Sequence, residues 1–230
     1  MALGSPVFIG EQPLKNMSVR LSLAIFGLIT SGHSTGSSCD TTQPERADFK
    51  AARARFNGDT ISFSLPKRFE PVSEERVKAL SNPVSQLKAW IARSAPDAPI
   101  SETIEIRSLQ SPAGQPAATS VFRLATLHGK IYLASCPDNF SFGALPALIR
   151  EAPDQESYGV VLACGDVRTA KPRRSDISAS YILRGAKDFY VLTWSVIGEP
   201  QSQAIPIDRD LWFKRITSLF PLQVCDAEIN

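Results

Sequence analysis

Two β-rich runs near the C-terminus carry the strongest hydrophobic pattern in the chain. Residues 177–184 and 188–197 are separated by Gly185-Ala186-Lys187, a composition typical of a hairpin loop. Successive side chains of a strand alternate between its two faces. In the second run one face would carry Phe189, Val191, Thr193, Ser195 and Ile197, and the other Tyr190, Leu192, Trp194 and Val196. Because both faces are largely apolar, we predict a central strand in a sheet covered on both sides.

The segment 208–220 follows with apolar residues at helical spacing. Asp208 suits the N-cap and Pro221 ends the run. The apolar positions are Leu211, Trp212, Ile216, Leu219 and Phe220. We predict a short amphipathic helix that packs against the sheet.

The rest of the chain alternates strand and helix patterns. Further strands are predicted at 59–65, 102–109, 119–127, 130–136 and 158–164, and helices at 73–94, divided near Asn82 by Pro83, and at 142–151. The His128-Gly129 pair between 119–127 and 130–136 predicts a tight hairpin turn. The sum is an α+β fold, with a mainly antiparallel sheet of about seven strands flanked by helices. We place it in a single domain over residues 59–230.

Two segments precede that domain. Residues 1–38 contain Met17 and Arg20, an apolar run at 21–30 and an exit of small residues, the parts of a secretory signal peptide after an N-terminal extension, with Met17 as an alternative start. Residues 39–58 are polar and basic, which predicts a linker with a helical turn at 51–55. The protein is therefore expected to be periplasmic or secreted, with no transmembrane segment in the mature chain.

The mature chain would carry four cysteines, Cys39, Cys136, Cys164 and Cys225. An even number in an exported protein indicates disulfides, with three pairings open. We favour Cys39 with Cys225, which ties the two ends together, and Cys136 with Cys164, which joins two strand ends. Lipid anchoring through Cys39 is disfavoured, because Gly36-Ser37-Ser38 precedes it where a lipoprotein signal has Leu-x-x.

Charge and motifs exclude several function classes. The net charge of +2 indicates neither nucleic acid nor a membrane surface as partner. His128 is the one histidine of the predicted mature chain, so no metal site, cofactor or catalytic residue is predicted. In the predicted hairpin, Cys136 would lie roughly 25 Å from His128. Glu102 and Glu105, at odd spacing, would fall on opposite faces of their strand.

One loop carries a concentration of basic residues. Arg168, Lys171, Arg173 and Arg174 lie between two predicted strands, with Asp166 and Asp176 at its edges. Arginine matches carboxylates and phosphates, so these residues are candidates for binding an acidic partner or an anionic surface. The alternative is a solvated loop that maintains solubility.

The element order resembles a known group. The strand ending Phe63-Ser-Leu-Pro66, a helix, a meander closing with Tyr190-Val-Leu-Thr-Trp194 and a terminal helix resemble the α/β/α sandwich of PsbP-like proteins. That resemblance implies a binding or assembly module rather than an enzyme. It carries over no individual residue.

The expected function is that of an exported, non-catalytic binding or assembly protein acting through an unknown protein partner. A periplasmic immunity protein is a specific version. The alternatives are an exported hydrolase with an unrecognised active site using Cys164, His128 or a serine, and a carrier of a small ligand or lipid. A carrier would need a large apolar cavity between sheet and helices.

Overall fold

The computed structural model of this protein describes residues 46–56, 59–79, 81, 85–95, 97–110, 120–146, 156–185 and 188–226, excluding the side chains of Gln223–Asp226. All of these residues belong to one compact unit, Gly36–Asn230. The predicted extension and signal peptide at 1–38 lie outside the described residues, as does Cys39. No helix within the described ranges is both long and apolar enough to cross a membrane.

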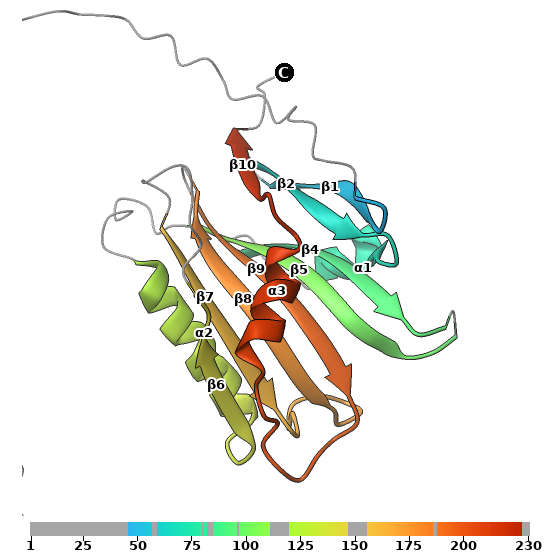
Figure 1. Ribbon diagram of the computed structural model, residues 1–230, viewed down its shortest axis with the longest axis vertical. Coiled ribbons are helices and arrows are strands. Elements are labelled where there is room, and N and C mark those ends of the chain that lie inside the picture. Colours follow the sequence, from blue (N-terminus) through green and yellow to red (C-terminus); the bar gives the residue numbers. More distant parts are fainter. Residues whose placement is uncertain are drawn as a thin grey trace, which may run out of the picture. The chain divides into compact units, whose positions relative to one another are not determined.

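Seven strands form one antiparallel sheet flanked by helices, which confirms the predicted α+β class (Figure 1). Their order in space is β3-β4-β5-β9-β8-β7-β6. The middle strand β9 (Asp188–Gly198) pairs with β8 (Ser175–Arg184), as the hydrophobic pattern predicts. The other strands are β3 (Glu70–Pro71), β4 (Ser85–Arg93), β5 (Ile100–Gln110), β6 (Phe140–Ala144) and β7 (Ser157–Cys164).

A second sheet and a helix cover one face of the large sheet, here called the packed face. In the second sheet β2 (Asp59–Pro66) lies between β1 (Phe49–Phe56) and β10 (Gln223–Asp226). Helix α3 (Arg209–Thr217) begins where the Asp208 carboxylate accepts a hydrogen bond from the Leu211 N–H at 2.9 Å. The core beneath them is apolar and includes Ile61, Phe63, Ile104, Tyr181, Tyr190, Leu192, Trp194, Trp212 and Ile216.

The helix prediction for 208–220 is thus confirmed, with one exception. Trp212, Ile216 and Leu219 are buried, but Leu211 is 51% exposed and lies outside the apolar stripe. Arg215 places its guanidinium over the rings of Trp194 and Trp212, at 5.5 and 4.9 Å from their centroids. This packing closes the covered side of the sheet.

Helix α2 (Val121–Ser135) covers only part of the opposite face, here called the groove face. It packs on β7 and β8, and Figure 1 shows it running alongside β7. Val121 and Ala125 are buried in the same cluster as Val160, Leu162 and Ile182. At the far edge the short helix α1 (Glu74–Ala79) lies against β4. The prediction that β9 is covered on both faces therefore holds only for part of its length.

Helix α2 also replaces the hairpin predicted for 119–127 and 130–136. Ser120 caps it, its Oγ accepting a hydrogen bond from the Arg123 N–H at 3.2 Å. Gly129 lies mid-helix, where an added Cβ would meet nothing within 4 Å, so no turn geometry requires a glycine there. The hairpin prediction is wrong because the helical spacing of the buried residues, and not the two-residue turn signature, determines the secondary structure of this segment.

Three other predictions are wrong. The predicted linker 39–58, with its helical turn at 51–55, contains β1, which pairs with β2 along its whole length and buries Ala54 and Phe56. The segment 73–94, predicted as two helices, contains α1 followed by strand β4. In β4 Trp90 and Ala92 are buried on one face, with the two-residue period of a strand. The first residues of the helix predicted at 142–151 belong instead to β6, an edge strand that pairs with β7. Residues 147–155 lie outside the described residues.

Candidate functional site

A groove opens on the groove face where the cover provided by α2 ends. Its volume is about 1150 Å³. Strands β4, β5 and β9 form the floor, α2 forms one wall, the α1 region forms the other, and the loop between β7 and β8 borders it. The floor residues are Leu87, Ala89, Ile91, Thr103, Glu105, Arg107, Leu109, Val191, Thr193, Ser195 and Ile197.

Strand register explains why polar residues lie at the centre of this otherwise largely apolar floor. One row across the sheet consists of Ala89, Glu105, Thr193, Ser180 and Val160. Polar side chains occupy its three central positions. As predicted, Glu102 lies on the opposite face from Glu105, where it accepts a hydrogen bond from Trp194 Nε1 at 2.8 Å.

The wall contributed by α2 is apolar with two polar groups. Its residues recur at spacings of three and four, so they form one stripe along the helix: Leu124, Leu127, His128, Ile131 and Tyr132. Leu127 is 53% exposed and Ile131 is 62% exposed. Two large apolar side chains are thus left open to solvent beside a floor of mixed apolar and polar residues, which is typical of a binding surface.

Two carboxyl groups of the groove are in a poorly solvated environment. Burial raises the pKa of Glu105, and the positive charges of Arg107 and Arg174 oppose that shift. Burial also raises the pKa of Asp176 to about 6, against a hydrogen bond from Tyr132 and the charge of Arg174. Among the described residues, Asp176 Oδ1 is buried without a hydrogen-bond partner. Asp176 Oδ1 therefore retains the capacity to accept a hydrogen bond from a further donor.

The polar groups on α2 are perturbed by the same environment. The Tyr132 hydroxyl donates a hydrogen bond to the Asp176 carbonyl oxygen at 3.1 Å, and burial raises the pKa of Tyr132 well above its usual range. Burial, assisted by Arg107, lowers the pKa of His128. His128 is accordingly neutral at physiological pH.

The structure brings His128 close to a serine, but not in a catalytic arrangement. Its Nε2 lies 3.4 Å from Ser180 Oγ, which is also 2.8 Å from Thr193 Oγ1. Ser180 is completely buried and does not line the groove, so a substrate cannot approach its oxygen. The pair acts as a hydrogen-bonded support beneath the floor.

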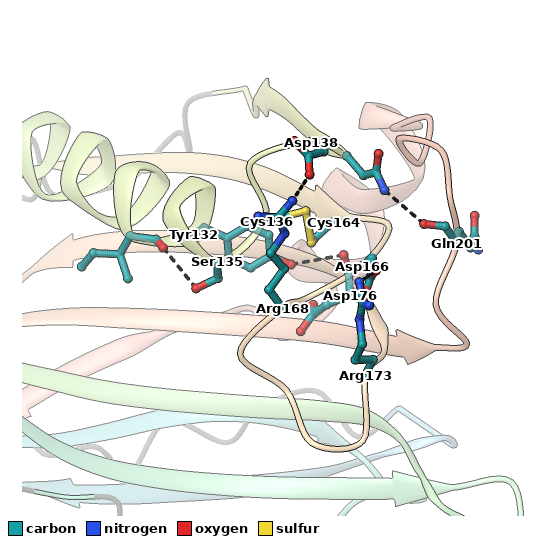
Figure 2. Close-up of a disulfide and its surroundings, with 12 residues drawn as sticks. Tyr132, Ser135, Cys136, Asp138, Cys164, Asp166, Arg168, Arg173, Asp176 and Gln201 are labelled. Atoms are coloured by element: carbon teal, nitrogen blue, oxygen red, sulfur yellow. Dashed lines mark hydrogen bonds and ion pairs between the residues drawn. A yellow bond between two sulfur atoms is a disulfide. The ribbon is translucent and has the colours of Figure 1, made fainter.

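Cys136 and Cys164 are not free thiols, because they form a disulfide that joins the end of α2 to the end of β7 (Figure 2). One of the two favoured cysteine pairs is therefore present, although it links a helix to a strand instead of two strands. On α2, eight residues separate His128 from Cys136, or about 12 Å at 1.5 Å per residue, so the predicted 25 Å is also wrong. Cys39 and the side chain of Cys225 lie outside the described residues.

Two of the four basic loop residues are engaged in ion pairs within their own surroundings. Arg168 pairs with Asp138 just beyond α2, and Arg173 pairs with Asp166, its Nε donating to Oδ1 at 2.8 Å (Figure 2). Arg168 N–H also donates to the Ser135 carbonyl oxygen at 3.0 Å. Together with the disulfide, these contacts fix the loop to the end of α2.

The other two basic residues face the groove. Lys171 and Arg174 line it, as does Arg173, whereas Arg168 does not. Within the described part of the chain, Lys171 and Arg174 form no ion pair. The charge of Lys171 is therefore available to a bound group, whereas that of Arg174 already acts on Glu105 and Asp176.

Neither a metal nor a catalytic site emerges from this arrangement. Among the residues that the structure describes, no three His, Cys, Asp or Glu side chains are grouped so as to hold a metal ion. What the groove offers is a mixed surface for binding.

The sequence did not predict that Glu105, Arg107, Tyr132 and Asp176 line one groove; Asp176 was noted only at the edge of the basic loop. The available signal was polar residues at period two in strands that were otherwise buried, such as Thr193 and Ser195 in β9. On a sheet with both faces covered, such residues indicate a face that is incompletely covered.

Comparisons with known proteins identify no family. No protein-family model matches this chain, and no curated protein matches it. Among solved structures, the chain is similar to the Ran-binding protein Mog1p of Saccharomyces cerevisiae, with a TM-score of 0.44 and 9% identity over 74% of this chain and 93% of that one. A mutant of the protein Mog1 matches with a TM-score of 0.40 and 10% identity over 75% of this chain and 85% of that one. Similarities this weak assign neither partner nor activity, and the resemblance to PsbP-like proteins stays a prediction.

Proposed function

We propose that this chain is an exported, non-catalytic binding protein that holds a segment of a protein partner in the groove between α2 and strands β4, β5 and β9. The observation that carries the proposal is the groove itself, with half-exposed Leu127 and Ile131 beside a floor of mixed apolar and polar residues. Its volume of about 1150 Å³ exceeds the roughly 300–1,000 Å³ of pockets that take small molecules. A polypeptide segment fits a groove of this size.

The disulfide supports the extracytoplasmic part of the proposal. Disulfides persist in oxidising compartments and are rare in the cytosol. Cys136–Cys164, together with the signal-like segment at 1–38, agrees with a periplasmic or secreted protein. A periplasmic immunity protein that holds a toxin segment in the groove is the specific version of this proposal.

Site-specific photocrosslinking in the periplasm tests the proposal. A photoreactive amino acid at Ile131 is expected to capture a defined partner, because this side chain borders the groove and is exposed. Leu133 is the matched control, since it is 42% exposed on the same helix but does not line the groove. The Ile131 adduct should disappear when Thr193→Arg fills the floor. Equal adducts from both positions, or no adduct at Ile131, would contradict the proposal.

A carrier of a small amphiphilic ligand is the second candidate. The apolar wall of α2 and the polar groups at its foot favour it, because such pockets hold a few polar groups among apolar ones. Native mass spectrometry of the protein recovered from the periplasm separates the two candidates. A copurifying small molecule that Thr193→Arg removes would favour the carrier, and a protein adduct would favour partner binding.

A further inference from the structure

The groove lies where the helices of the described part of the chain leave the sheet uncovered. Helix α2 contacts β7 and β8, while the neighbouring width of β4, β5 and β9 forms an open floor. Three strands about 4.8 Å apart present a strip about 10 Å wide, which matches the diameter of one helix. Along β5 the floor extends from Thr103 to Leu109, roughly 20 Å, the length of about 13 helical residues.

The orientation of the sheet decides between a helix and an extended segment. The floor is a sheet face, so it presents side chains, whereas an extended peptide takes its backbone hydrogen bonds from a sheet edge. A segment buried on this face must satisfy its own N–H and C=O groups. A helix does so internally along most of its length.

The charges of the lining indicate the sign of the occupant. The described lining contains five basic residues against three acidic ones, a net of +2: Arg76, Arg107, Lys171, Arg173 and Arg174 against Glu105, Asp176 and Glu199. Arg173 is held by Asp166, and Arg107 lies near Glu105. Lys171 and Arg174 are both exposed at the border of the groove. Arg174 also acts electrostatically on Glu105 and Asp176, whereas Lys171 has no acidic neighbour among these contacts. Positive charge is therefore concentrated at the loop beside the end of α2.

We propose that the partner segment is an acidic amphipathic helix that lies beside α2 and completes the helical layer. Its apolar side chains contact Leu127, Ile131 and Val191, and its carboxylates face Lys171 and Arg174. This inference rests on the proposed function and specifies the chemistry of the partner. Electrostatic complementarity of this kind determines which partner is accepted more than how much area is buried.

The inference is tested with stapled helical peptides of about 13 residues, titrated into the disulfide-bonded mature protein. One peptide carries Leu on one face and Glu on the other. The matched peptides replace Glu by Lys, or keep the composition and insert a central proline. NMR amide shifts report where each peptide binds and fluorescence anisotropy reports how tightly.

We expect the acidic helix to shift amides of α2 and of residues 171–174 and to bind at least tenfold more tightly than the other two peptides. Lys171→Glu with Arg174→Glu should weaken it about tenfold and reverse the preference towards the Lys peptide. Lys130→Glu is the matched control, because Lys130 is exposed on α2 and does not line the groove, and it should leave the affinity unchanged. Equal binding of the Lys or proline peptide, or no saturable binding of the acidic helix, would overturn the inference.

The two proposals fail in distinguishable ways. If the Ile131 adduct forms in the periplasm and persists in the Lys171→Glu/Arg174→Glu protein, the groove binds a partner and the acidic helix is wrong. If no adduct forms at Ile131, the binding function itself is wrong. Binding to vesicles of phosphatidylglycerol that exceeds binding to the acidic peptide would assign the positive charge to a membrane surface and overturn the inference.

Discussion

Two neighbouring rows of the large sheet, one residue apart along every strand, have opposite characters. The row on the packed face consists of Trp90, Ile104, Trp194, Ala179 and Val161, all apolar. The next row, on the groove face, contains Glu105, Thr193 and Ser180 at its centre. The packed row lies under the second sheet and α3, and its partners are all within the chain. The groove row borders an open groove, so its polar side chains are not covered by an apolar layer as the packed row is.

The largest expected difference between the faces is in the cost of truncating a side chain. Leu192→Ala on the packed face should lower the free energy of unfolding by about 2–5 kcal/mol, because Leu192 is 1% exposed and surrounded by core. Ile197→Ala on the groove face is the matched change in the same strand and should cost less than about 1.5 kcal/mol. Urea unfolding with the disulfide intact measures both. Equal losses would mean that the groove face is packed as tightly as the other.

Asp176 provides the next test, because its carboxyl group is buried on the groove face without full pairing. Its pKa is raised from 3.8 to about 6 on folding, so the unfolded chain ionises first as pH rises. Stability should therefore fall between about pH 4 and 6, by up to about 3 kcal/mol. Asp176→Asn should remove this loss and stabilise the protein at pH 7 while changing little at pH 3.5.

The measurement is urea unfolding at several pH values. Asp138→Asn is the control, since Asp138 is 68% exposed and its pair with Arg168 is worth less than about 1 kcal/mol. A wild-type stability that rises steadily from pH 4 to 6, unchanged in Asp176→Asn, would show that Asp176 is solvated.

The packed face could largely be predicted from the sequence, and the groove could not. Apolar alternation in 188–197 identified the central strand, and the spacing of Trp212 and Ile216 identified α3, because burial enforces those patterns. The hairpin predicted at His128-Gly129 was wrong because the local turn signature was clearer than the helical stripe, which contains polar as well as apolar residues. Strand β1 was missed because its small and basic residues give little apolar contrast.

The site residues were hidden for a related reason. Glu105 and Asp176 line the same groove only through strand order β5-β9-β8, which joins segments far apart in the chain. The basic loop was visible as a cluster, but sequence alone could not separate Arg168 and Arg173, which are paired, from Lys171 and Arg174, which face the groove.

Two glycines sharpen the comparison with the same chemical change. In Gly159→Ala on β7, the new Cβ would lie 2.5 Å from Tyr181 Cε1 and 2.9 Å from Leu145 Cβ, so we expect a loss of about 1–3 kcal/mol. In Gly129→Ala on α2, the Cβ meets nothing within 4 Å, and a mid-helix alanine should add about 0.5–1 kcal/mol. Thermal unfolding of both variants gives the signs. A loss in Gly129→Ala would mean that α2 needs its glycine for the groove.

His128 gives the smallest and most specific effect. Its pKa is lowered on folding by burial and by Arg107, so the folded state takes up this proton less readily than the unfolded chain, whose value is near 6.5. Its contribution is present above about pH 6.5 and is lost as pH falls towards the lowered pKa, opposite in sign to Asp176. In the Asp176→Asn background, stability should therefore still rise as pH increases towards about 6.5, and His128→Gln should flatten that slope. If His128→Gln also abolished an activity without unfolding the protein, the groove would be catalytic. The groove face would then differ from the packed face by carrying out a reaction and not by binding a partner.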